Sequence, residues 1–180
     1  MATATLYPMP AFNAGPSPAA PSITGPERFS PEQRRRLSGP GMRTFLAIAN
    51  LWGLTEDQRR MILGMPPRST FHGWVRAARE HGALRLDLDT LLRISAVLGI
   101  HQALGVLFGT EQEAIAWLRG THGAPVFGGN PPLSLLTCGT QDGLLSVRRF
   151  LDAARGGLYM PPNSLDTDAQ ALTDADIVFS

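Results

Sequence analysis

Side chains that can contact nucleic acid gather in residues 68–79 and in the segment just before them. They are Arg59, Arg60, Arg68, Ser69, Thr70, His72, Arg76 and Arg79. An arginine can form two hydrogen bonds with a guanine edge, so we predict that Arg68 and Arg76 read bases. The serine, threonine and histidine are shorter candidate readers. Arg59 and Arg60 are better placed for phosphates, which position a protein on DNA without specifying sequence.

Two short helices joined by a tight turn must position these side chains. Thr55 and Gln58 have the spacing of a capping box, which predicts one helix over 55–64. We expect the second helix over 69–81, with Ser69 as its cap and Trp74 and Val75 as core residues. A helix-turn-helix presents the start of its second helix to the major groove. The alternative is an ordinary helical hairpin whose arginines form a solvated face.

The net charge changes sign along the chain. Residues 1–110 contain 12 arginines and 7 acidic residues, giving +5, whereas residues 111–180 contain 4 arginines and 8 acidic residues, giving −4. A basic front half favours nucleic acid as a partner, and an acidic back half favours a different partner.

The remaining pattern predicts more helices and no strand, which makes the fold class all-α. A short helix from Pro31 should stop at GPG (39–41), and another should run from Met42 to Gly53. The apolar window 91–109 is interrupted by charged and polar residues, so we read it as two buried helices broken at Gly99 rather than a membrane span. An apolar stripe is expected on the first of these two, at Leu88, Leu91, Leu92, Ser95 and Leu98. Further helices are expected at 110–119, 132–137 and 141–155.

Composition indicates the cellular compartment and the kinds of chemistry to expect. A single cysteine, Cys138, fits a reducing compartment, and the first 26 residues lack the pattern of a secretory signal, so we expect a cytoplasmic protein. We expect Cys138 to be a small buried apolar residue. The four histidines lack the spacing of a metal site, and no nucleophile–base pattern stands out. We therefore expect no enzyme activity, no metal and no cofactor.

Residues 110–157 carry an ordered series of motifs. Trp117-Leu118 is followed by Phe127-Gly128-Gly129, PPLSLL (131–136), Gly143, VRRFL (147–151) and Gly156-Gly157. In this order the motifs resemble the C-terminal toxin-binding domain of Xre/MbcA/ParS-type antitoxins. With an Xre-like helical region at 42–108, the resemblance extends over most of the part expected to be ordered.

The resemblance implies an Xre-like helix-turn-helix domain at 30–109 followed by a small helical toxin-binding domain at 110–157. Residues 1–29 would be a disordered extension and residues 158–180 an acidic tail. The implied partners are operator DNA and a RES-domain toxin, a class that degrades NAD or transfers ADP-ribose from it. The antitoxin would cover the entrance to the toxin's active site and repress its own operon as a homodimer.

The candidate toxin contacts lie outside the apolar stripe predicted for 141–155. They are Phe127, Asn130, Pro131, Arg148, Arg149 and Arg155, with Asp166 and Asp168 in the tail. The two aspartates are included because an acidic segment can occupy a cationic phosphate site, although a solvated terminus is the alternative. A second reading of the whole chain is a stand-alone dimeric phage-type repressor whose back half only dimerises.

Overall fold

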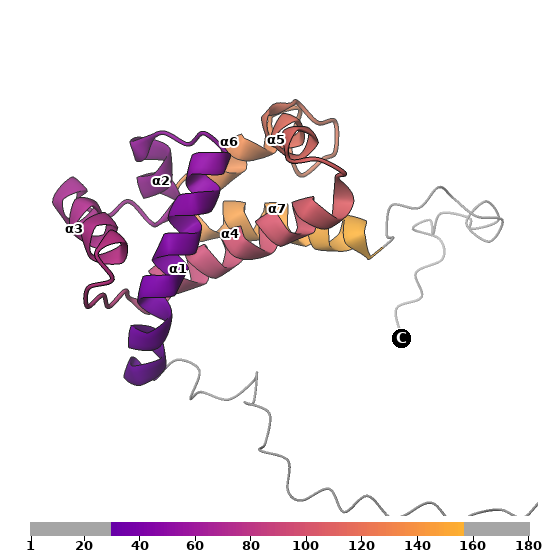
Figure 1. Ribbon diagram of the computed structural model, residues 1–180. Helices are drawn as coiled ribbons and strands as arrows, with labels where there is room; N and C mark the ends of the chain where they lie inside the picture. The colour runs from indigo at the N-terminus through magenta and orange to yellow at the C-terminus, as the bar shows by residue number, and fades with distance from the viewer. Residues whose placement is uncertain (1–29, 157–180) are drawn as a thin grey trace, which may run out of the picture.

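The computed structural model describes residues 30–156, which form seven α-helices and no strand (Figure 1). The helices are α1 (Pro31–Leu51), α2 (Glu56–Ile62), α3 (Arg68–Arg79), α4 (Leu88–Leu107), α5 (Glu111–Arg119), α6 (Pro132–Leu136) and α7 (Gln141–Arg155). The all-α prediction is confirmed over this range. The expectations for residues 1–29 and 158–180, including Asp166 and Asp168, lie outside the described residues.

Helix α1 runs straight through the segment that was expected to stop it. It begins as predicted, with the Ser30 hydroxyl accepting from the Gln33 amide, but Pro40 lies inside the helix. A proline inside a helix removes one backbone hydrogen bond and its ring clashes with the carbonyl four residues earlier. It also restricts the residue before it, and Gly39, which has no Cβ, lessens that second restriction. The buried face that begins at Ser38 and Met42 packs on α4 and holds the helix together across the proline. The predicted break was therefore wrong.

Helix α4 is also continuous, so the predicted break at Gly99 was wrong too. Its buried face differs from the expected stripe, because Arg93, Ile94, Val97 and Ile100 point inward whereas Leu92 is 40% exposed. The helix packs against α1, α5 and α7, and contacts on several sides obscure a single apolar stripe. Among the described residues, α4 is also the one helix long and apolar enough to cross a membrane by length and composition.

One contiguous hydrophobic core runs from Met42 in α1 to Leu151 in α7, so the expected boundary at 109/110 does not divide the core. Arg93 also connects separate parts of this core. Its side chain is only 9% exposed. Its Nε donates to Asp89 Oδ2 at 2.6 Å, and its Nη1 donates to the carbonyls of Ile62 and Gly139 at 3.5 and 3.1 Å. A single buried guanidinium thus joins α2, α4 and the turn before α7.

The C-terminal helices follow the predicted pattern closely. Thr110 caps α5 through a capping box, and α6 and α7 lie within the expected ranges. Leu144, Val147 and Leu151 are buried, as the stripe predicted. Cys138 is exposed rather than buried, because it lies in the turn between α6 and α7, with its sulfur 3.0 Å from the Thr140 hydroxyl.

Two helical glycines should respond to alanine in opposite ways. A Cβ on Gly143 would meet the backbone carbonyl of Leu135 and the Cys138 sulfur 2.6 Å away, whereas a Cβ on Gly73 would meet nothing within 4 Å. We expect Gly143→Ala to destabilise the fold, since overpacking costs about 1–3 kcal/mol. Gly73→Ala should stabilise it by up to about 1 kcal/mol. Urea unfolding of both variants tests this, and equal shifts of the same sign would contradict the close α6–α7 approach.

Candidate nucleic-acid and partner interfaces

Helices α2 and α3 form the predicted helix-turn-helix. Thr55 makes the expected capping box with Gln58. Helix α3 begins one residue earlier than expected, with Pro67 as its N-cap, so Ser69 is not the cap. Phe71 and Ala78 are the buried anchors of α3, while Trp74 and Val75, the predicted anchors, are only partly buried. The exposed first turn of α3 carries Arg68, Ser69 and Thr70.

Carboxylates from α2 occupy the cationic start of α3. Arg68 Nη2 lies 3.1 Å from Asp57 Oδ1, and its Nε lies 3.8 Å from Glu56 Oε1. His72 Nε2 lies 3.1 Å from Glu56 Oε2. The hydrogen bond from Arg68 lowers the pKa of Asp57, and the same bond raises the pKa of Arg68. Any DNA contact by Arg68 or His72 therefore has to compete with these two acids.

The lowered pKa of Asp57 gives a direct test of this pairing. A carboxyl with a depressed folded pKa stabilises the fold above its unfolded pKa, and the effect is lost as the pH falls through the folded value. The pair is exposed, so salt should weaken it. We expect Arg68→Gln to raise the Asp57 pKa toward its ordinary value in a carboxyl NMR titration. An unchanged Asp57 titration in the variant would show that Arg68 is not its partner.

The arginines of α2 hold the local backbone. Arg59 Nε donates to the Leu54 carbonyl at 2.9 Å, and Arg60 Nε donates to the Pro66 carbonyl at 3.0 Å. Arg60 also pairs with Asp57 at 3.1 Å. Both side chains are partly buried at the base of the motif. Their predicted role on DNA phosphates stays a prediction, and the structure adds a positioning role for the turn.

The second half of α3 is the more open cationic surface. Arg76 and Arg79 are exposed and form no ion pair within residues 30–156. With His72, Val75 and Glu80 they line an open groove of about 380 Å³. These two arginines are thus available to a polyanion without first breaking an internal pair.

Phe127 does not lie on the surface from which a toxin contact was predicted. It is 3% exposed, and its ring lies 4.8 Å from Phe150, 5.7 Å from His122 and 5.8 Å from Trp117 between centroids. The expectation of a surface side chain was wrong, because the loop 120–131 folds back over α5 and α7. The Gly128-Gly129 pair that follows has positive φ angles of 55° and 80°, which permits this turn.

The other predicted toxin contacts fall into two groups. Arg148 is half-buried and structural: its Nη1 donates to the Ser95 carbonyl at 3.2 Å, across Gly99 of α4. Asn130 and Arg149 are exposed, Arg155 is exposed and lies 3.7 Å from Asp152, and Pro131 is partly buried. Local sequence signals did not indicate the pocket beside Arg149, which is lined by Ala124, Pro125, Val126, Ser146, Arg149 and Phe150.

Family comparisons match the two halves of this helical body. Residues 31–99 match the antitoxin Xre-like helix-turn-helix domain, and residues 103–157 match the antitoxin Xre/MbcA/ParS C-terminal toxin-binding domain. The chain belongs to the Xre/MbcA/ParS antitoxin family. The antitoxin is also 36% identical to protein y4oB of Sinorhizobium fredii over 116 residues, which cover 64% of this chain and 84% of that protein.

The two family matches meet inside one continuous helix of the antitoxin. The helix-turn-helix match ends at residue 99 and the toxin-binding match begins at residue 103, both within α4 (Leu88–Leu107). Figure 1 shows α4 lying between α1 on one side and α7 on the other. The antitoxin therefore presents its DNA-binding and toxin-binding parts on one shared core helix rather than on two units joined by a linker.

Proposed function

We propose that this antitoxin neutralises a RES-domain toxin, one that degrades NAD or transfers ADP-ribose from it, by covering the entrance to the toxin's active site. We propose further that it represses its own operon as a homodimer through α2 and α3. The observation that carries the proposal is the pair of family matches on one continuous helical body. The RES identity of the toxin rests on the sequence resemblance described above.

The proposed toxin-binding surface centres on the loop 120–131 and the adjoining face of α7. Val126 is 39% exposed beside the pocket that Arg149 and Phe150 line. An exposed apolar side chain rimmed by an arginine and a serine has the composition of a protein interface core with its polar rim. Asn130 and Arg149 extend this surface, and Arg155 lies at its edge. Asp166 and Asp168 remain proposed contacts outside the described residues.

The proposed DNA surface needs two copies of the chain. One recognition helix buries too little surface for tight specific binding, so helix-turn-helix proteins bind as dimers to two half-sites. Arg68, Ser69, Thr70 and His72 are the proposed base readers at the start of α3, with Arg76 and Arg79 following. The acids that hold Arg68 predict that its base contact is weaker than an unpaired arginine would give.

A co-expression experiment separates this proposal from the stand-alone repressor. A RES-domain toxin from the same operon is expressed alone, with the wild-type antitoxin, or with the variant Val126→Asp/Arg149→Glu, while cellular NAD and growth are followed, and the absence of any such toxin gene would itself count against the proposal. We expect NAD loss with the toxin alone, protection by the wild type, and reduced protection by the variant. A chain that binds its promoter as a dimer, yet neither binds the toxin nor preserves NAD, would establish the repressor instead.

A further inference from the structure

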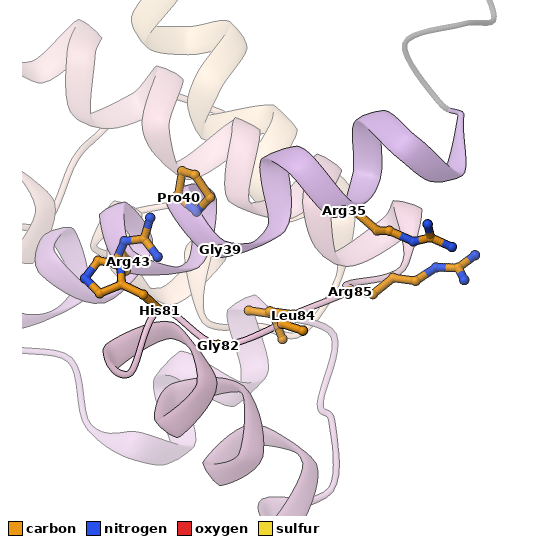
Figure 2. Close-up of a pocket in the computed structure, with 9 residues that line it drawn as sticks. Arg35, Gly39, Pro40, Arg43, His81, Gly82, Leu84 and Arg85 are labelled. Carbon is orange, nitrogen blue, oxygen red and sulfur yellow. The ribbon is translucent and has the colours of Figure 1, made fainter.

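A second cationic groove lies between α1 and the segment that joins α3 to α4 (Figure 2). Its volume is about 440 Å³, and its lining includes three arginines, Arg35, Arg43 and Arg85, together with the His81 ring. Pro40 and Leu84 contribute apolar surface. Among residues 30–156, no acidic residue lines this groove, so the described lining carries positive charge from its arginines alone. None of these four residues belongs to the set predicted from the helix-turn-helix pattern.

The cations of this groove have no acidic partner within residues 30–156. Arg35, Arg43, His81 and Arg85 form no ion pair there, in contrast to Arg68 and its two carboxylates. In Figure 2 the guanidinium groups of Arg35 and Arg85 extend toward the same end of the groove, with Arg43 and His81 at the other. Like charges directed to one place repel, and an anion between them relieves the repulsion.

Buried hydrogen bonds hold the two arginine-bearing segments together. The Leu86 amide donates to Ser38 Oγ at 2.9 Å, and Ser38 Oγ donates to the Arg34 carbonyl at 2.6 Å. Ser38 is fully buried and Leu86 nearly so. Arg85 precedes Leu86 and Arg35 follows Arg34, so this hydrogen-bonded chain fixes their backbones beside each other. The fold therefore sets the backbone positions from which both guanidinium groups extend.

The opposite end of the groove is attached to α3. The Gly82 amide donates to the Ala77 carbonyl at 2.9 Å, which closes the end of α3 and leaves His81 at a φ of 54°. Glycine is the usual residue at this left-handed position, and histidine accepts some backbone strain there. Arg43 Nη1 approaches the Ala78 carbonyl at 3.5 Å, which connects α1 to the last turn of α3. The groove thus continues the surface that carries Arg76 and Arg79.

We propose that this groove binds a backbone phosphate of duplex DNA next to the site that α3 reads. This inference rests on the proposed DNA binding and adds a phosphate clamp to it. A guanidinium group matches the geometry of phosphate oxygens and can donate two parallel hydrogen bonds to them. Contacts to phosphate fix the register of a protein on the duplex. The clamp lies beyond the C-terminal end of α3, away from the acid-paired start of that helix.

The test compares Arg35→Gln/Arg85→Gln with Arg36→Gln in the full-length chain. Arg36 is a neighbouring exposed arginine of α1 that does not line the groove, so it controls for the loss of one charge, and each single variant, Arg35→Gln and Arg85→Gln, is compared with it as well. Affinity is measured by fluorescence anisotropy across a salt series, for the promoter duplex and for a random duplex of equal length. We expect the double variant to lose roughly tenfold or more on both duplexes. The magnitude of its salt slope should fall by about 0.9, since the groove is proposed to hold one phosphate and each phosphate contact contributes about 0.9.

Three results would overturn the clamp. The double variant could keep the wild-type affinity and slope, or Arg36→Gln could weaken binding as much as the double variant does. In a third arm, inorganic phosphate or adenosine monophosphate is titrated while the His81 ring is followed by NMR. Loss of this free-phosphate binding without loss of DNA binding would assign the groove to a small anion rather than to DNA.

Failure of the proposed DNA binding can be distinguished from failure of the phosphate clamp. If the wild-type chain binds neither duplex, then the autorepression proposal fails. The DNA clamp fails with it, and a shift of the His81 signals by inorganic phosphate in the wild type but not in the double variant would then assign the groove to a small anion. Toxin neutralisation should be the same for wild type and double variant, because the groove is built from α1 and the α3–α4 segment, outside the proposed toxin surface.

Discussion

Replacing Phe127 with alanine is expected to lower the free energy of unfolding by about 3–5 kcal/mol. The side chain is 3% exposed and contacts three aromatic rings, those of Trp117, His122 and Phe150. Alanine removes those contacts and leaves a cavity in a core that also holds the loop 120–131 in place. Urea unfolding monitored by tryptophan fluorescence measures the loss.

Two controls separate burial from binding at this position. Phe127→Leu keeps much of the apolar volume and should cost less than Phe127→Ala. Val126→Ala, at the exposed neighbour, should change stability by no more than about 0.5 kcal/mol while weakening the toxin complex. A Phe127→Ala variant that is as stable as the wild type but fails to bind toxin would show that Phe127 is a toxin contact rather than a core residue.

Leu144→Ala is expected to lower the free energy of unfolding by about 2–5 kcal/mol. It should destabilise the helix-turn-helix as well as the C-terminal helices. Leu144 is fully buried in α7, and α7 packs along α4, which in turn packs on α1. Because one core spans all of these helices, the loss should lower the stability of the whole described body. Far-UV circular dichroism and tryptophan fluorescence should report one coincident transition in both wild type and variant.

Leu92→Ala is the matched control for Leu144→Ala. Leu92 lies on the exposed face of α4, so its truncation should change stability little. If Leu144→Ala unfolded the C-terminal helices alone and left a second transition for α1–α3, the two parts would be separate units. The shared α4 and the hydrogen bonds of Arg93 would then contribute little to cooperativity.

Local signals in the sequence predicted a large part of the fold. Both capping boxes, at Thr55 and Thr110, fix helix starts through neighbouring hydrogen bonds that need no distant partner. The α6–α7 hairpin was predicted by its prolines, its turn and a regular apolar stripe. Such features depend on residues close together in the chain, so a single sequence is enough to read them.

Several of the wrong predictions involve distant contacts. Pro40 and Gly99 look like breaks, yet the buried neighbours of Pro40, Ser38 and Met42, pack α1 on α4, and Arg148 of α7 lies over Gly99. Arg93 interrupts an apolar window in the sequence, but in the fold its guanidinium finds three oxygens on α2, α4 and the turn at Gly139. Phe127 sits in a glycine-rich loop and is nevertheless core. None of these partners can be identified from neighbouring residues.

The same contrast between local signals and distant contacts applies to the proposed DNA surface. The sequence indicated α2 and α3, and the arginines of α3 were visible in it. It did not show that Glu56 and Asp57 pair with Arg68 and His72, because these residues are 11 to 16 positions apart. Nor did it bring Arg35 beside Arg85, which depends on the buried hydroxyl of Ser38.

The proposed neutralisation is tested most directly by titrating the purified toxin that we propose as partner, a RES-domain protein, with the purified antitoxin while NAD consumption is recorded. The account predicts that NAD consumption falls to the background rate once the antitoxin reaches the stoichiometry of the complex, and that Val126→Asp/Arg149→Glu shifts this titration to higher concentration. NAD consumption that stays at the full rate in excess wild-type antitoxin would contradict it.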